Sequence, residues 1–383
     1  MPIDPARQQQ AKEYARTRHR LLALEVALTA LALVAVMALG LNVWLKQIVF
    51  AITRDPSPPS AGQAIWLATF LYFAVAFIAY GVMFFPLSYY GGFVLPHRYG
   101  LSTQTRRAWF ADELKGGALG IALGGVVIEV IYAVLRATPA TWWLWASAFM
   151  LVFNVLLANL APVLILPIFF KFKPLEDAEL VARLSALAER AGTRVRGVFT
   201  MMLSEKTTAA NAALMGLGNT RRIVLGDTLY EKYSHDEIET ILAHELGHHV
   251  HRDIAWGLVV EIALTLAGFF IADLFLRASV ARLGYESIAD LAAMPLFALA
   301  LGAFGAITLP LGNAFSRWRE ALADAYALQA TRNAPAFIGA MEKLANQNLA
   351  EVEPERWVEL VLYSHPPIGK RIKQGERFAA ANK

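Results

Sequence analysis

Six long apolar segments are the feature of this chain that most restricts its fold. At a rise of 1.5 Å per residue, each is long enough to cross a hydrocarbon core of about 30 Å. The chain has 383 residues, of which 57% are apolar and only 17% are charged, whereas soluble domains carry about a quarter charged residues. The sequence therefore predicts a mainly α-helical, polytopic membrane protein. We expect the spans at residues 21–45, 64–85, 116–135, 142–170, 254–276 and 293–311.

Basic residues gather in alternate connections between these segments. Five precede the first span and four follow the second, whereas the connections on the other side hold one or two each. Because basic loops stay in the cytoplasm, we expect both termini and residues 171–253 on the cytoplasmic face. This clustering also accounts for the net charge of +4, so no nucleic-acid partner is expected.

The first apolar segment, residues 21–45, bears on where the chain resides. It is too long for the core of a cleavable signal peptide, so we expect it to remain as a span. The expected partner of the apolar surface is the lipid bilayer. If the source is a bacterium, this would be its inner or plasma membrane.

The polarity pattern divides the chain into four parts. One polar stretch follows the fourth span and another follows the sixth, and both are expected to belong to a domain on the cytoplasmic side. The parts are residues 1–170 with four spans, 171–253, 254–312 with two further spans, and 313–383.

The polar stretches contain short periodic elements. Residues 176–191 have leucines at helical spacing, and residues 195–203 and 222–225 have the composition of short strands. Residues 211–218 fit either a strand or a glycine-rich turn, so a small β-sheet is expected. The pattern of residues 315–332 is helical.

Ser234 is expected to begin a further helix. Glu237 follows it at the spacing of a capping box, in which each residue pairs with the backbone N–H of the other. The helix would continue through Ile241 and could run directly into the span at residues 254–276.

This helix contains the sequence His244-Glu245-Leu246-Gly247-His248. Two histidines four residues apart lie on one face of a helix, where their nitrogens can bind one zinc ion at about 2.0–2.1 Å. Glu245 would then stand beside the water and could take its proton. The chain has no cysteine, so a metal must be held by His, Asp or Glu.

A catalytic zinc ion takes three protein ligands and keeps one open position. His251 is a poor third ligand because it follows His248 by only three residues. A carboxylate from farther along the chain is better, and Glu320 and Asp324 could act as a ligand and as the group that orients a histidine. Spacing alone leaves the third ligand open among Glu261, Glu286, Asp290, Glu320 and Asp324.

These residues together resemble the type-I CAAX prenyl proteases, an integral-membrane family of gluzincin zinc proteases. The resemblance implies that Glu320 is the third zinc ligand and that Asp324 supports a histidine from behind. It also implies membrane helices around a water-filled chamber that a cytoplasmic catalytic domain closes. The segments that carry it are 89–117, 211–218, 222–229, 244–248, 320–326 and 363–371.

The resemblance assigns three further residues near the substrate. His365 and Arg371 correspond to residues that steady the developing oxyanion and the substrate backbone. Residues 211–218, with Asn211, would supply an edge strand on which an extended substrate lies. Eukaryotic members have seven spans, so the count of six lacks one. The ionisable residues Glu25 and Glu129 inside spans are expected to face the chamber or a partner, and a position at a helix end is the alternative for Glu25.

The expected function is zinc-dependent hydrolysis of peptide bonds, with one Zn²⁺ per chain. By the resemblance, the substrates are peptides or proteins cut near a prenylated C-terminus. One alternative is a protease for quality control of unprenylated membrane proteins. Another is a non-enzymatic scaffold or transporter with a structural zinc, although such sites are usually closed by four ligands that often include cysteine.

Overall fold

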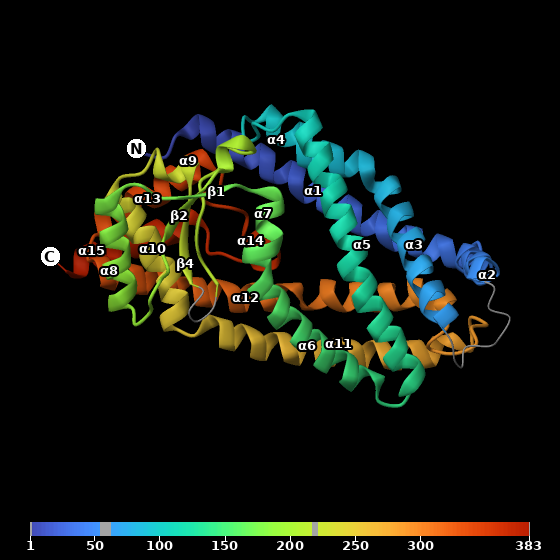
Figure 1. Ribbon diagram of the computed structural model, residues 1–383. Helices are drawn as coiled ribbons and strands as arrows, with labels where there is room; N and C mark the ends of the chain where they lie inside the picture. The colour runs from blue at the N-terminus through green and yellow to red at the C-terminus, as the bar shows by residue number, and fades with distance from the viewer. Residues whose placement is uncertain (1, 54–62, 217–220, 383) are drawn as a thin grey trace.

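The computed structural model describes residues 2–53, 63–216 and 221–382. It is an elongated molecule in which long helices run side by side and a mixed α/β unit lies at one end (Figure 1). Six helical segments of the described residues are long and apolar enough to cross a membrane, which confirms the polytopic prediction. They are Pro5–Ala38, Ile65–Arg98, Arg106–Ala137, Trp142–Phe169, Asp253–Val280 and Leu291–Thr331.

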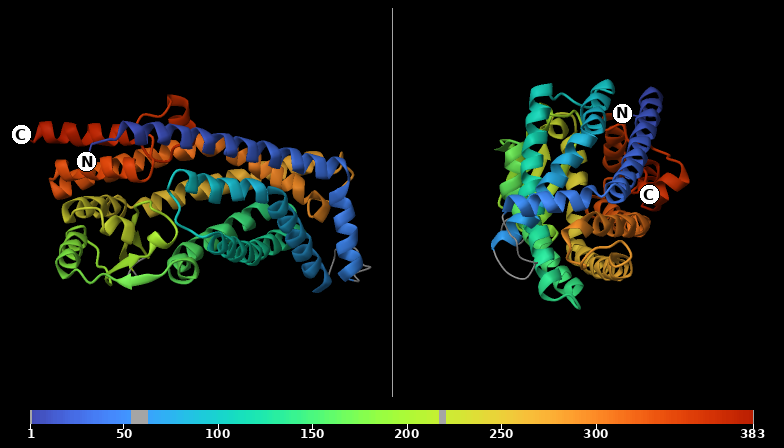
Figure 2. Two further views of the ribbon diagram at one scale, coloured as in Figure 1. Left: turned by 90° about the horizontal axis from the view of Figure 1, so that it is seen from above. Right: turned by 90° about the vertical axis from the view of Figure 1, so that its right-hand side faces the viewer.

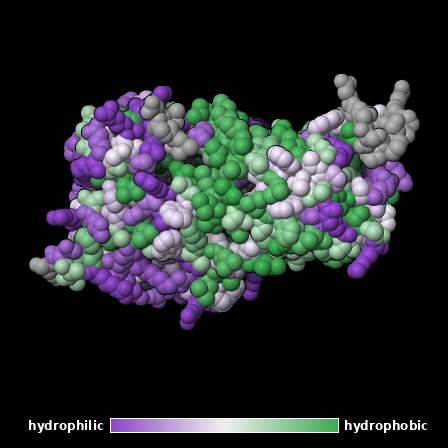
Figure 3. Space-filling model, turned by 90° about the horizontal axis from the view of Figure 1, so that it is seen from below, coloured by the Kyte–Doolittle hydropathy of each residue, from purple (hydrophilic) through white to green (hydrophobic). Residues whose placement is uncertain are grey.

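The surface polarity follows this division. On the face that Figure 3 shows, apolar side chains predominate over the helical part of the molecule, whereas the end that holds the α/β unit is mostly hydrophilic. An apolar surface of this size is stable when lipid covers it and is rare in soluble proteins. The hydrophilic end is therefore the part that projects from the bilayer.

The first predicted span is wrong at its C-terminal end. Helix α1 (Pro5–Ala38) stops before Gly40, and α2 (Leu41–Thr53) is a separate, shorter apolar helix. Gly40 has a φ of +68°, a left-handed conformation that glycine adopts at no steric cost. Hydropathy extends through this turn without a change, which explains why the sequence indicated one span. At the other end, the side chain of Asp4 caps α1 by accepting from the N–H groups of Ala6 and Arg7.

The second and fourth spans each contain a short π-helical segment. Helix α3 (Gln63–Tyr89) continues through the π-turn Tyr90–Val94 into α4 (Leu95–Arg98). The fourth span, predicted at 142–170, has the same construction, and its helices end at Phe169. Prolines lie in these regions and remove backbone donors from the regular ladder. The fourth span consists of α6 (Trp142–Leu160), the π-turn Ala161–Ile165 and α7 (Leu166–Phe169).

Two other helix boundaries differ from the prediction. The sixth span and the helix expected at 315–332 form one helix, α12 (Met294–Thr331), which runs from one to the other without a turn. Helix α10 (His235–Val250) does not continue into α11 (Asp253–Val280), because Arg252 between them has a φ of 55°. The remaining span is α5 (Arg106–Ala137).

The α/β unit contains a four-stranded mixed sheet in the order β1-β2-β4-β3. Strands β2 and β4 are parallel, whereas β1 and β3 pair antiparallel with them. The predicted strands at 195–203 and 222–225 are confirmed, and residues 211–218 contain the strand β3, although residues 217 and 218 lie outside the described residues. Strand β1 was not predicted. The strands are Phe172–Pro174, Val198–Met201, Ala212–Met215 and Arg222–Gly226.

Helices pack around this sheet and complete the unit. In α8 (Ala178–Arg190), which confirms the helix predicted at 176–191, the leucines 180, 184 and 187 are buried. They share one apolar core with α10 and with the C-terminal helices. The other elements are η3 (Leu203–Glu205), α9 (Asp227–Tyr230), η5 (Leu291–Ala293), α13 (Ala334–Gln347), α14 (Arg356–Leu362) and α15 (Ile368–Ala381).

A cavity of about 1810 Å³ lies between the membrane helices and the α/β unit. Residues of α1, α3, α5 and α12 line it, together with the segment before α15. Glu25 is among its lining residues, as expected. Glu129 is not, and its carboxylate oxygens are buried within the helix bundle, so the expectation that it faces the chamber is wrong.

The contact between α10 and α12 gives a direct test of this packing. A Cβ atom at Gly247 would lie 2.9 Å from Ala323 Cα and 3.1 Å from its carbonyl oxygen. Because backbone atoms cannot move aside cheaply, we expect Gly247→Ala to lower the free energy of unfolding by about 1–3 kcal/mol. Thermal unfolding in detergent micelles measures this loss.

Gly257 provides the matched control. It is also helical, but a Cβ atom there meets nothing within 4 Å, so Gly257→Ala should leave the melting temperature unchanged or raise it slightly. Equal melting temperatures for both variants would contradict the close packing.

Candidate metal centre

Helix α10 is fixed at its start by a capping box. Glu237 N–H donates to Ser234 Oγ at 3.3 Å, and Ser234 N–H donates to the Glu237 carboxylate at 2.7 Å. The sequence prediction of this helix start is therefore confirmed. Two turns farther on, His244 and His248 lie on one face, and their Nε2 atoms are 3.3 Å apart.

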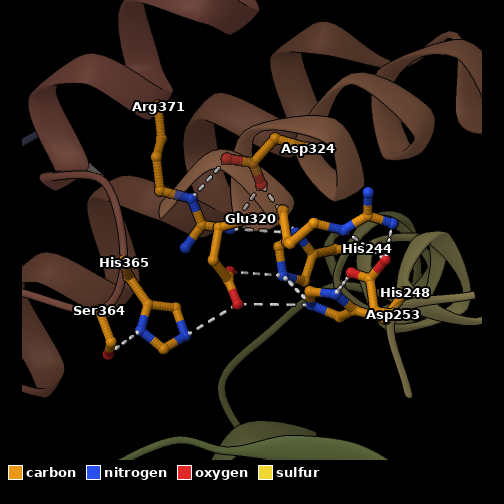
Figure 4. A network of polar contacts seen from close by, with 9 residues as sticks. His244, His248, Asp253, Glu320, Asp324, Ser364, His365 and Arg371 are labelled. Atoms are coloured by element: carbon orange, nitrogen blue, oxygen red, sulfur yellow. Dashed lines mark hydrogen bonds and ion pairs between the residues drawn. The ribbon is translucent and has the colours of Figure 1, made fainter. Parts of the chain in front are cut away.

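Helix α12 brings a carboxylate to these two nitrogens. Glu320 Oε2 lies 3.2 Å from His244 Nε2, and Glu320 Oε1 lies 3.5 Å from His248 Nε2 (Figure 4). The Glu320 side chain is only 9% exposed. Residues separated by two membrane crossings thus converge on one point.

The three side chains fit a zinc ion. Four ligands at about 2.0–2.1 Å in a tetrahedron are about 3.3 Å from one another. Here the two Nε2 atoms are 3.3 Å apart, and the Glu320 oxygens lie at 3.2 Å (Oε2 to His244) and 3.5 Å (Oε1 to His248). The charge also fits. Burial by itself lowers the pKa of His244, but hydrogen bonds with Asp324 and Glu320 outweigh it and raise that pKa to about 9. The site therefore favours positive charge.

The far nitrogen of His244 is held by a buried ion pair. Its Nδ1–H donates to Asp324 Oδ1 at 2.8 Å. Arg371 donates to the same carboxylate from Nε at 2.8 Å and from Nη2 at 2.6 Å. Asp324 is fully buried. With a metal on Nε2, this arrangement would keep the remaining ring proton on Nδ1 and direct the Nε2 lone pair at the metal.

His248 is held in the same way by two residues that the sequence analysis missed. Its Nδ1–H donates to Asp253 Oδ2 at 2.7 Å, and Arg319 Nε donates to Asp253 Oδ1 at 2.8 Å. Arg319 Nη2 also donates to the carbonyl oxygen of His251 at 2.6 Å. The left-handed conformation of Arg252 turns Asp253 back toward the histidine, and no feature of the sequence alone announces that turn.

Glu245 has the properties of a proton acceptor that can also hold a proton. It follows His244 directly on α10, and its side chain is partly buried. Burial raises the pKa of its carboxyl above the ordinary value for glutamate. A raised pKa brings a general base closer to the pH at which it must both accept and release a proton.

His365 approaches Glu320 from the side opposite to the two histidines (Figure 4). Its Nε2 lies 3.3 Å from Glu320 Oε1, and its Nδ1 lies 2.9 Å from Ser364 Oγ. Partial burial lowers the pKa of this imidazole. Ser364 and His365 also line the cavity, so this imidazole stands between the metal centre and the space inside the membrane part.

Two other predicted site residues lie farther from the convergence point. Arg371 lines the cavity, yet its guanidinium is engaged by Asp324 behind His244. Asn211 directly precedes β3, has an exposed side chain, and accepts through its carbonyl oxygen from Gly226 N–H at 2.8 Å. Strand β3 ends the described sheet on one side and packs near α10, as the edge-strand expectation requires.

The other candidate third ligands are engaged elsewhere. Glu261 accepts a hydrogen bond from Asn154 within the helix bundle. Glu286 and Asp290 both pair with Lys46 Nζ at 2.9 Å. Among the described residues, the geometry therefore resolves the choice that spacing left open in favour of Glu320.

Two family models match consecutive parts of the chain. Residues 2–171 match a model described as the N-terminal part of CAAX prenyl proteases with five membrane helices. Residues 174–378 match the model of peptidase family M48. The five helices agree with the four spans of this region together with the shorter apolar helix α2.

Curated relatives and a solved structure extend the similarity. An uncharacterized metalloprotease, YhfN of Bacillus subtilis, is 32% identical over 290 residues, which cover 75% of this chain and 68% of the relative. CAAX prenyl protease 1 of Saccharomyces cerevisiae is 30% identical over 312 residues, covering 75% and 67%. The crystal structure of S. mikatae Ste24p superposes with a TM-score of 0.81 at 25% identity, over 97% of this chain and 89% of that one.

The pair formed by Asp253 and Arg319 gives a test of the metal centre. Without a carboxylate on its Nδ1, His248 loses its fixed orientation and part of its basicity. We expect Asp253→Asn to weaken Zn²⁺ binding about 10–100-fold, as removal of such supporting groups typically does. Competition with a chelator of known affinity measures the constant.

Asp236→Asn is the matched control. Asp236 lies in the first turn of the same helix, where it pairs with Arg183, so the affinity for Zn²⁺ should not change. Unaltered binding in Asp253→Asn would show that this carboxylate does not support the site.

Proposed function

This chain belongs to peptidase family M48 as a membrane metalloprotease of the CAAX prenyl protease kind, and we propose that it is a zinc-dependent endopeptidase that cleaves proteins near a prenylated C-terminus. The observation that carries the proposal is the convergence of His244, His248 and Glu320 beside His365, which lines the cavity between the long apolar helices. Each of the two histidines is fixed by its own carboxylate, the fully buried Asp324 for His244 and the half-buried Asp253 for His248.

Zinc is the metal that this donor set favours. Two imidazoles and one carboxylate, with no cysteine in the chain, are typical of catalytic sites that keep a fourth position open. When bound, zinc would polarise the scissile carbonyl and make a water molecule more acidic. Asp324 with Arg371 and Asp253 with Arg319 would keep the Nε2 lone pairs of the two histidines directed at it.

Glu245 is proposed as the general base. Its carboxylate would take the proton from the attacking water and hold it until the peptide bond breaks. It would then give the proton to the leaving nitrogen. The raised pKa that burial gives this carboxyl supports both steps.

His365 is proposed to stabilise the oxyanion. Ser364 Oγ–H can donate to Nδ1, which places the ring proton on Nε2, the atom that faces the metal centre. An N–H donor in that position stabilises negative charge that develops on the carbonyl oxygen. Arg371, which is engaged by Asp324, is assigned mainly to holding His244 in position.

The free edge of β3 is proposed to bind the substrate backbone. An extended peptide can add to an exposed strand by main-chain hydrogen bonds, which presents its peptide bonds in a regular row. Asn211 would contact the substrate at the start of this edge. Strand β3 packs near α10, so a peptide on it would pass close to the two histidines.

The cavity suits a lipid-modified C-terminus. Its walls carry apolar residues of three membrane helices, such as Leu22, Phe77 and Ile121, and its inner end reaches His365. A prenyl chain could leave water there while the peptide reaches the metal centre. We further propose, from the distribution of basic residues, that the α/β unit and both termini are cytoplasmic, at the inner or plasma membrane if the source is bacterial.

One of the relatives carries no substrate in its name. The Bacillus subtilis relative is named only as a metalloprotease, so substrates without a prenyl group, such as damaged membrane proteins, are the alternative. A non-enzymatic scaffold or transporter with a structural zinc is disfavoured by three protein donors in place of four.

The role of Glu245 predicts a separation of binding from turnover. Glu245→Gln should keep one Zn²⁺ per chain and lower the rate of peptide cleavage by about 10²–10⁴-fold or more. Mass spectrometry of the cleaved peptide and elemental analysis of the protein measure the two properties. Glu239→Gln, on the same helix but paired with Arg183, is the control and should retain activity. Full activity in Glu245→Gln would reject the assignment.

The substrate class can be tested with two peptides of one sequence, one farnesylated at cysteine and one unmodified. Burial of the prenyl group in the cavity contributes about 0.8 kcal/mol per methylene, so kcat/KM should be at least about tenfold higher for the farnesylated peptide. A chelator should stop cleavage of both. Equal cleavage of the two peptides would favour the quality-control alternative.

A further inference from the structure

Helix α14 (Arg356–Leu362) has an apolar face that nothing within the described chain covers. Trp357 is 56% exposed and Leu360 is 49% exposed, whereas Val358 on the opposite face is 6% exposed. Arg356 is also exposed on the outer side. The helix ends three residues before His365, so whatever binds this face also restrains the segment at the metal centre.

The neighbours of α14 place it at the level of the membrane surface. On α1, the ring of His19 lies 6.4 Å from the ring of Tyr363, which follows α14. The apolar part of α1 begins two residues later, at Leu21, which is about 3 Å along the helix. On α12, Asn313 Nδ2 donates to the carbonyl oxygen of Val361 at 2.7 Å. Asn313 follows the predicted end of the sixth span, Leu311, by about 3 Å.

The two distances of about 3 Å past the apolar parts of α1 and α12 place α14 in the headgroup region of the bilayer. The headgroup region extends about 5–8 Å beyond the hydrocarbon core on each side, so an element about 3 Å past the apolar edges of two spans lies within it. Figure 2 shows the red-orange segment that contains α14 protruding from the side of the molecule, and not from its hydrophilic end. A lateral position is the one that meets lipid.

The carbonyl groups at the C-terminal end of α14 are hydrogen-bonded within the protein, which suits a location with little water. The last carbonyl groups of a helix have no partners within it, and in water they would bond to solvent. Here Arg317 Nη1 donates to the carbonyl oxygens of Glu359 at 2.8 Å and Tyr363 at 2.5 Å. Arg317 Nη2 reaches Leu360 O at 3.4 Å, and Asn313 serves Val361. Two side chains of α12, Arg317 and Asn313, therefore provide hydrogen bonds to the carbonyl groups at this end of α14.

Exposed tryptophans also occur on two neighbouring helices, α11 and α12. Trp256 near the start of α11 is 53% exposed, and Trp318 on α12 is 55% exposed. Trp318 lies seven residues after Leu311, so it extends the exposed apolar stripe of α12 toward the hydrophilic end. Tryptophan is enriched at both membrane–water interfaces. The exposed Trp357 of α14 is a residue of the same kind.

We propose that α14 is an interfacial helix that lies in the headgroup region of the bilayer, with Trp357 and Leu360 inserted among the lipids and Arg356 directed at the phosphates. Residues of these types are those that bind a helix to a phospholipid surface. The membrane then holds the segment that carries Ser364 and His365 at a fixed depth. This inference does not rest on the proposed peptidase activity.

The chain has no cysteine, which allows a direct measurement of depth. Trp357→Cys and Leu360→Cys are each labelled with a nitroxide, and the full chain is placed in liposomes of phosphatidylcholine and phosphatidylglycerol. Accessibility to oxygen, which concentrates in lipid, is compared with accessibility to a water-soluble nickel chelate. Glu179→Cys on α8, where the native side chain is 74% exposed, is the control in the hydrophilic end.

We expect both α14 labels to be more accessible to oxygen than to the nickel chelate, and the label at position 179 to show the reverse. Labels at 357 and 360 that match the control would overturn the proposal. Low accessibility to both reagents would also overturn it, because that result means that protein, such as a second copy of the chain, covers the face.

A measurement on the unsubstituted protein guards against a folding defect in the variants. Hydroxyl-radical oxidation of Trp357 should be lower in liposomes than in short-chain detergent stripped to its minimal belt, while oxidation of exposed Trp-free segments such as α8 stays constant. Equal oxidation of Trp357 under both conditions would contradict lipid contact.

Discussion

The close contact between α10 and α12 positions the three candidate ligands of the metal centre. Gly247, between the two histidines of α10, faces Ala323 of α12 so closely that even a methyl group would collide with the backbone. Glu320 lies one turn before Ala323, and Asp324 directly follows it. The approach of two helix backbones thus brings a carboxylate to both imidazoles, and a supporting carboxylate to one of them.

The site also depends on charges that are expensive to bury. Asp324, Arg371, Glu320 and Arg319 are each less than a tenth exposed. A buried ion pair gains little net stability because desolvation offsets its attraction. Its use here is to fix orientation. Each arginine holds a carboxylate, each carboxylate holds the Nδ1–H of one histidine, and both Nε2 atoms consequently point to one place.

Much of this arrangement could be predicted from the sequence, for identifiable reasons. Hydropathy reports contact with lipid, so it located six spans, and the capping box at Ser234 marked the helix of the histidines. Hydropathy does not report backbone turns, so the breaks at Gly40 and Arg252 were missed and α12 was divided in two. Spacing could not select Glu320, because a chain that crosses the membrane twice can return any of several carboxylates. The resemblance to a known family made that choice, whereas Asp253 and Arg319 became visible only through the turn at Arg252.

The hydrophilic end and the membrane part meet at the metal centre. The arrangement described here serves a metal that is held by two imidazoles and one carboxylate. X-ray absorption at the zinc edge on the purified, zinc-loaded chain tests this most directly. The account predicts one zinc per chain, bound only by nitrogen and oxygen at about 2.0–2.1 Å, with the scattering of two imidazoles and a changed first shell in Glu320→Ala. A zinc ion without two imidazole ligands, or a first shell that Glu320→Ala leaves unaltered, would contradict it.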